Sequence, residues 1–190
     1  MSASILKSVP SISRGSLCFR LFSLLLIAVV FFSMFHSVQG KRSEAPVEIQ
    51  YLQIDMESVR AIFSLARKLQ ISADNSVPSL VMDFRGNVLG SVIAGKCAAI
   101  PGNAGPVPVV VGLDLDGGVA GVALMPSRET QSYIARIMKS GLLSAWNGFK
   151  PASADKVRVD TVSGATRTSK AVIRTVEHIL SRLDVTVRGN

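Results

Sequence analysis

The residues best suited to chemistry lie near the carboxyl end of the chain, in the segment Ser163-Gly164-Ala165-Thr166. Its two smallest residues let a ligand come close to the backbone, and Thr166 adds a hydroxyl group. A strand-like run precedes the segment and a helical pattern follows it. The segment should therefore direct backbone N–H groups and the positive end of a helix at one small space, which suits a phosphate group. Ser163, Thr168 and Ser169 are further hydroxyl donors for such a group.

Other interpretations of this segment remain open at this point. Thr166 or Thr168 is also a suitable N-cap for an ordinary helix, with Arg167 and Lys170 simply solvated. A Walker A loop is excluded, because the second Gly and the Lys-Ser/Thr pair are missing, and the chain has no G-x-G-x-x-G. A Ser163 nucleophile served by His178, the only His after residue 40, is disfavoured because the G-x-S-x-G context is absent.

The elements that must position these residues can be predicted from hydrophobic periodicity and turn residues. Helical spacing is found at 54–71, 130–141 and 169–183, paired strands are expected at 80–84 with 88–94 and at 109–115 with 119–124, a Gly- and Pro-rich loop spans 95–108, and a last short strand covers 156–160. This order predicts an α+β domain in which an antiparallel sheet of hairpins is backed by helices.

The overall composition excludes several classes of protein. The chain has 190 residues, 48% of them hydrophobic, and a net charge of +8. That size allows one globular domain plus a leader. The basic residues are not interleaved with aromatic ones, so we expect no nucleic-acid partner. Cys18 and Cys97 are the only cysteines, which leaves no internal disulfide in the body and no zinc or haem spacing, and we expect no metal site.

Residues 1–40 have the features of a leader. A basic start is followed by an apolar stretch over 21–35, and small residues precede a suitable cleavage point after Gly40. Since 21–40 is also free of charge and about long enough to span a bilayer, a cleaved signal peptide and an uncleaved anchor both remain open. We divide the chain into 1–40 as signal peptide or membrane anchor, 41–53 as connector and 54–190 as the domain. Either form of leader places the domain outside the cytoplasm, on the periplasmic side, free or anchored to the inner membrane.

The wider sequence resembles the FMN-binding domain family, including its fold. The resemblance covers about 55–183 and rests on ordered features, namely Leu89-Gly90, Gly102-x-x-Gly105-Pro106, Val111-Gly112-Leu113-Asp114, Asp116-Gly117, Glu129-Thr130, Trp146 and Asp160 to Thr166. One departure is Gln131-Ser132, where the family commonly has Pro-Gly after Glu-Thr. Similar domains form peripheral flavin subunits of sodium-translocating NADH:quinone reductase and of Rnf-type electron transport complexes.

The resemblance also implies a function. In the family, the last Thr of the motif carries FMN through a phosphodiester, which corresponds to Thr166 here. FMN would be donated from FAD by a separate flavin transferase, with Mg²⁺ assisting the departure of AMP. Ser163, Gly164, Ala165, Thr168, Ser169, Glu129 and Thr130 would line the flavin site. The chain would then be an electron-transfer component rather than a complete enzyme, with subunits of a membrane redox complex or another electron donor and acceptor as partners. A non-covalent FMN-binding or structural module is the alternative.

Overall fold

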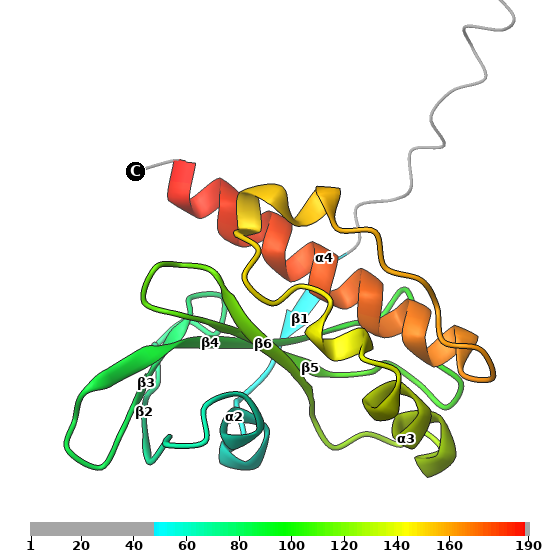
Figure 1. The fold of residues 1–190 in the computed structure, drawn as a ribbon, viewed down its shortest axis with the longest axis horizontal. Coiled ribbons are helices and arrows are strands. Elements are labelled where there is room, and N and C mark those ends of the chain that lie inside the picture. The colour runs from blue at the N-terminus through cyan, green and yellow to red at the C-terminus, as the bar shows by residue number, and fades with distance from the viewer. Residues whose placement is uncertain (1–47, 189–190) are drawn as a thin grey trace, which may run out of the picture. The chain divides into compact units, whose positions relative to one another are not determined.

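The computed structural model describes residues 48–188, which form an antiparallel sheet with helices on both of its faces (Figure 1). In chain order the elements are β1 (Ile49–Tyr51), α2 (Met56–Ile62), β2 (Lys68–Gln70), β3 (Ser79–Met82), β4 (Val88–Cys97), β5 (Val109–Leu113), β6 (Val119–Leu124), α3 (Gln131–Lys139), the 3₁₀ turns η1 (Leu142–Ser144) and η2 (Pro151–Lys156), and α4 (Thr166–Arg188). The predicted α+β class with an antiparallel sheet of hairpins is confirmed. The predicted leader, 1–40, lies outside the described residues.

The sheet has the order β2-β3-β4-β5-β6, with β1 attached to the long strand β4. β3 pairs with the first half of β4, where Ser79 lies opposite Val92, and β1 pairs with its end, where Ile49 lies opposite Cys97. β5 runs along the other side of β4. The strand β1 therefore begins the sheet within the segment 41–53.

Successive residues of the central strands point to opposite faces of the sheet, and each face has its own core. On β4, Ile93 belongs to the core beneath α4, whereas Val92 and Ala94 belong to the core beneath α2. Figure 1 shows α4 crossing one face, with α2 on the other. Each fully buried Val or Ile side chain contributes about 1.5–3 kcal/mol.

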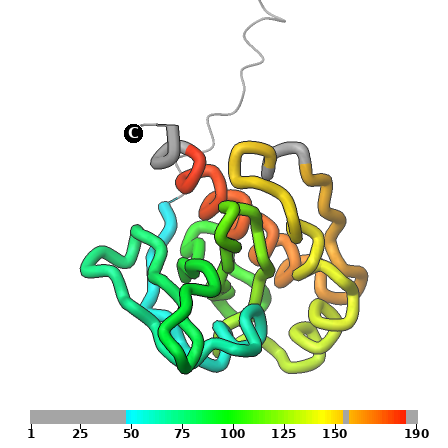
Figure 2. Tube along the Cα trace, turned by 60° about the vertical axis from the view of Figure 1, so that its left-hand side comes forward, coloured from blue at the N-terminus to red at the C-terminus, as the bar shows by residue number. Residues whose placement is uncertain are grey.

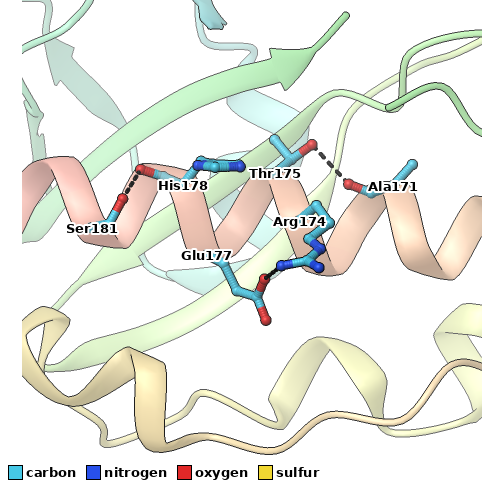
Figure 3. Close-up of polar contacts among 6 residues, drawn as sticks. All are labelled: Ala171, Arg174, Thr175, Glu177, His178 and Ser181. Carbon is cyan, nitrogen blue, oxygen red and sulfur yellow. Dashed lines mark hydrogen bonds and ion pairs between the residues drawn. The ribbon is translucent and has the colours of Figure 1, made fainter. Parts of the chain in front are cut away.

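The predicted division of α4 into an inner and an outer face is confirmed. Val172, Val176, Ile179, Leu180 and Leu183 are buried, and Ser181 and Arg182 are exposed. Figure 3 shows the middle of this helix, where Thr175 donates to the carbonyl of Ala171 and the partly exposed Arg174 pairs with Glu177 at 3.3 Å. The apolar face anchors α4 to the sheet.

The helix predicted at 54–71 is too long. Helical structure ends at Ile62, and Lys68–Gln70 instead forms β2, which pairs with β3. The reason lies in tertiary packing. Phe63 lies against Gly90 and Gly112 of the sheet, where an added Cβ would come within 3.0 Å of its ring, so the chain must leave the helix to reach this contact.

Three other boundaries also differ from the prediction. The strand expected at 156–160 is not formed, because η2 occupies Pro151–Lys156 and the chain then runs without regular structure to 162. β4 continues to Cys97 because β1 pairs with it. The last helix begins at Thr166, three residues earlier than expected, so the motif itself opens the helix.

No helix within residues 48–188 combines the length and apolar composition needed to cross a membrane.

Candidate functional site

The motif forms a tight turn that leads directly into α4. The N–H of Ala165 donates to the carbonyl of Val162 at 3.0 Å, with Ser163 and Gly164 at the centre of the turn. Gly164 has φ +74°, a conformation that residues with a Cβ rarely adopt. The first helical bond runs from the Ser169 N–H to the Ala165 carbonyl, at 2.8 Å. The N–H groups of the three residues from Thr166 to Thr168 therefore lie at the open, positive end of the helix.

The side chain of Ser169 holds this turn from the inside. Its hydroxyl accepts from the Val162 N–H at 3.0 Å and lies within 3.1 Å of the carbonyls of Ala165 and Thr166, to which it donates. Ser169 and Ala165 are buried. Ser169, predicted from the sequence as a phosphate donor, thus has its hydroxyl engaged within the protein.

A second set of internal hydrogen bonds connects Thr168 and Glu129. The Thr168 hydroxyl donates to Glu129 Oε2 at 2.7 Å, and Glu129 Oε1 accepts from the N–H of Ala104. Both side chains are buried, Thr168 being 1% and Glu129 4% exposed. The carboxylate therefore connects the first turn of α4, the entrance to α3 and the loop that contains Ala104.

Gly102 leaves the space that the Glu129 carboxylate needs to make these hydrogen bonds. A Cβ at this position would lie 2.6 Å from Glu129 Oε1, and the Gly102 N–H closes a tight turn onto the Gly105 carbonyl at 2.7 Å. The Gly-rich loop and the Glu-Thr dipeptide, separate in the sequence, thus belong to one structural unit. Thr130 is exposed and is the N-cap residue of α3, without a capping bond from its side chain. A direct contact of Glu129 or Thr130 with flavin stays a prediction.

The outer side of the motif is open and basic. Ser163, Gly164 and Thr166 are exposed, as are Arg167 and Lys170. Figures 1 and 2 both show α3 beside the chain that leads into α4. Arg136 of α3 lies against Gly164, and its Nη1 would be 2.7 Å from an added Cβ. Sequence reasoning did not single out Arg136, because nothing in the local pattern distinguishes it from any other exposed arginine on a helix.

A cavity of about 410 Å³ begins at the motif. Its lining consists of Ser140, Gly141, Leu142, Ala145 and the segment from Arg158 to Ser163. Two further cavities lie elsewhere, one of about 610 Å³ beside Ala104 and Ser127, and one of about 600 Å³ between α2 and α3. Ligand sites for molecules of this size usually have about 300–1,000 Å³. The volume of the cavity at Ser163 lies within this range, as do those of the other two cavities.

The hydroxyl nucleophile considered at Ser163 has no support from His178. His178 lies in the middle of α4, where its carbonyl accepts from the Ser181 hydroxyl at 2.9 Å (Figure 3). At about 1.5 Å per residue, it is about 18 Å along the helix from Thr166. This distance separates the imidazole from the turn.

Comparisons with known proteins give one family match and one similar solved structure. Residues 102–181 match the family model described as the FMN-binding domain. The fold is similar to the crystal structure of NqrC from Shewanella oneidensis, with a TM-score of 0.41 and 17% identity, over 74% of this chain and 86% of that one. No curated protein matches the chain significantly in sequence. The matched region contains Gly102, Glu129, Arg136 and the whole motif.

Proposed function

We propose that this protein is an extracytoplasmic electron-transfer flavoprotein that carries FMN on Thr166 through a phosphodiester. One observation carries the proposal beyond the family match. Three hydroxyl side chains lie in the first turn of α4, and only that of Thr166 is exposed, whereas Thr168 and Ser169 are buried and hydrogen-bonded to the protein. An enzyme that modifies this turn would meet Thr166 first.

The residues around Thr166 fit a phosphate group. The N–H groups at the start of α4 attract an anion by about 0.3–1 kcal/mol, and the exposed hydroxyl of Ser163 is a further donor. The cavity that begins at Ser163 offers room for the flavin ring. Bound flavin supplies the redox chemistry by carrying one or two electrons, and the protein supplies orientation and charge.

Attachment is a phosphoryl transfer without any oxidation. The Thr166 hydroxyl oxygen attacks the phosphorus on the riboflavin side of FAD, and a new O–P bond forms. The bond between this phosphorus and the bridging oxygen breaks, AMP leaves with that oxygen, and the hydroxyl proton is released. Because a Thr hydroxyl is a weak nucleophile at neutral pH, the reaction needs a dedicated flavin transferase.

The proposal includes a location and partners. The leader predicted at 1–40 would bring the domain to the periplasmic side, where a covalent bond prevents loss of the flavin by diffusion. An electron carrier needs a donor and an acceptor, and we propose subunits of a membrane redox complex for these roles. Protease treatment of spheroplasts tests the location, since the domain should be degraded while a cytoplasmic marker survives.

Covalent loading is tested by co-expression with a flavin transferase and a denaturing gel under ultraviolet light. A fluorescent wild-type band that is absent from Thr166→Ala is the expected result. A dark wild-type band would refute covalent loading, and flavin that is released on denaturation would identify a non-covalent FMN site instead.

A further inference from the structure

We propose that Arg136 of α3, which lies against Gly164, binds the flavin phosphate together with the start of α4. This inference rests on the proposed function and adds to it a residue from a different element. Arg136 would act as a positioning residue, because it holds the phosphate and takes no part in electron transfer.

The first argument is the contact between Arg136 and the turn. Measured from the position of an added Cβ at Gly164, Nη1 lies at 2.7 Å, Cζ at 3.2 Å and Nε at 3.6 Å. Several atoms of the guanidinium group thus cover Gly164, two residues before Thr166. A side chain at residue 164 would have to displace this end of the flexible arginine side chain. Gly164 therefore serves two purposes, since it permits φ +74° and leaves room for the arginine.

The second argument is that α3 is firmly placed. Ile137, the residue after Arg136, is fully buried in the core beneath α4, and Tyr133 packs against the same core. The carbonyls of Arg136 and Ile137 accept from the Ser140 N–H at the end of the helix. The backbone of Arg136 is therefore held in a fixed position relative to the core beneath α4.

The third argument is that the guanidinium is available. Among the described side chains, those of 48–153 and 157–184, Arg136 has neither a hydrogen-bond acceptor nor an ion-pair partner, and it is exposed to solvent. The carboxylate of Glu129 is occupied by Thr168 and Ala104. An arginine can bind two phosphate oxygens at once through its planar fork, whereas a lysine offers only a point charge. A phosphodiester on Thr166 would supply the acceptors that Arg136 lacks.

The test uses the full chain, with flavin transferase and limiting FAD, in wild type, Arg136→Gln, Arg136→Lys and the control Arg85→Gln. Arg85 is exposed at the β3–β4 turn, so its replacement removes the same charge far from the motif. We measure the initial rate of covalent labelling by in-gel fluorescence at low and high salt. We also measure the unfolding temperature of each protein before and after loading.

Arg136→Gln should label about tenfold more slowly than wild type at low salt, as expected for loss of a charge-assisted hydrogen bond, and the difference should shrink at high salt. Arg136→Lys should fall between the two, and Arg85→Gln should match wild type. Loading should raise the unfolding temperature of Arg136→Gln less than that of wild type, while the unloaded proteins unfold at similar temperatures.

Three results would overturn the assignment, and they are distinguishable. Equal labelling rates and equal loading shifts in wild type and Arg136→Gln would remove Arg136 from the site and leave the proposed function intact. Slower labelling with an unchanged loading shift would mean that Arg136 contacts the transferase rather than the phosphate. A wild-type protein that takes no label would overturn both the assignment and covalent loading.

Discussion

The hydroxyl groups of the motif differ chiefly in what surrounds them. Thr166 is exposed at the end of α4, whereas Thr168 is buried against Glu129, at 2.7 Å. The two side chains are chemically the same and only two residues apart. Their environments make one suitable for modification and the other a support for the turn.

Replacement of these residues should have opposite effects. Thr166→Ala should abolish covalent flavin and leave the free energy of unfolding within about 0.5 kcal/mol of wild type, because the side chain is exposed. Thr168→Val should keep its label per folded molecule and lower the free energy of unfolding by about 1–3 kcal/mol, because Glu129 Oε2 loses its partner in a buried place. Mass spectrometry and denaturant titration measure the two quantities. Loss of label in Thr168→Val would mean that the modified hydroxyl was wrongly assigned.

Gly164 allows a test of steric fit. Gly164→Ala should lower both the labelling rate and the free energy of unfolding, because the methyl group would meet Arg136 and φ is +74°. Gly117→Ala is a matched control, since Gly117 has the same φ but no atom within 4 Å of the added Cβ. Strain from the backbone alone, about 1–2 kcal/mol, should appear in both. Equal losses of unfolding free energy and equal labelling rates in the two variants would mean that the contact between Gly164 and Arg136 affects neither stability nor labelling.

At the scale of elements, the site depends on how a loop, α3 and α4 meet. Glu129 accepts from Ala104 on the loop and from Thr168 on α4, and Gly102 leaves room for the carboxylate. The position of Thr166 thus depends on a carboxylate that precedes it by 37 residues in the sequence.

Variants of Glu129 should show this dependence. Glu129→Gln keeps an acceptor for Ala104, and the Thr168 hydroxyl can turn to accept from the new amide, so we expect a loss of stability below about 1.5 kcal/mol. Glu129→Ala leaves both partners unsatisfied and should cost about 2–4 kcal/mol. Hydrogen exchange should then be faster at Ala104 and in the first turn of α4. Unchanged hydrogen exchange at Ala104 and in the first turn of α4 would contradict the conclusion that Glu129 connects them.

The β3–β4 turn should weaken in acid. A hydrogen bond from the side chain of Asn87, with further bonds from the backbone of Asn87 and Arg85, holds the pKa of Asp83 below its usual range. Since the pKa is lower in the folded state, this stabilisation is present at neutral pH and is lost below about pH 4. Denaturant midpoints of wild type and Asp83→Asn, measured from pH 7 to pH 3, should converge in acid. A difference between the two midpoints that stays the same from pH 7 to pH 3 would mean that the hydrogen bonds of the Asp83 carboxylate do not cause it.

At the scale of the whole molecule, one sheet joins two cores. The core under α4 contains Trp146, and the core under α2 contains Val59, while neighbouring residues of β4 and β5 belong to different cores. Both cores pack against the same strands, so unfolding of the sheet would expose the apolar residues of both cores to water. The described domain should therefore unfold as a single unit.

Trp146 is a convenient probe of this cooperativity, because it is the only Trp of the chain and is fully buried. In a denaturant titration, Trp fluorescence should shift in one transition that coincides with the loss of circular dichroism. Two separated transitions would mean that the α2 side of the sheet unfolds independently of the α4 side.

Much of the fold and part of the candidate site could be predicted from the local spacing of hydrophobic and turn residues. The two hairpins, α3 and the inner face of α4 were predicted because alternation and helical spacing reflect one-sided burial. The helix at 54–71 was predicted too long, because Phe63 packs against Gly90 and Gly112 of the sheet, and such a contact between distant segments is not encoded locally. Arg136 was missed for a similar reason, since its role depends on which residue lies beside it across the fold.

The sequence by itself determined the motif, the α+β class and the match of residues 102–181 to the FMN-binding domain model, because these depend on residue order and on the local preferences of the chain. Only the tertiary structure decided which hydroxyl is exposed, which carboxylate supports the turn and which arginine lies against Gly164. Burial and contacts between distant segments arise when the sheet brings α3, α4 and the loop at 102–105 together. The motif thus supplies the candidate acceptor at Thr166, and the fold leaves Thr166 open to solvent, two residues from the glycine against which the Arg136 guanidinium lies.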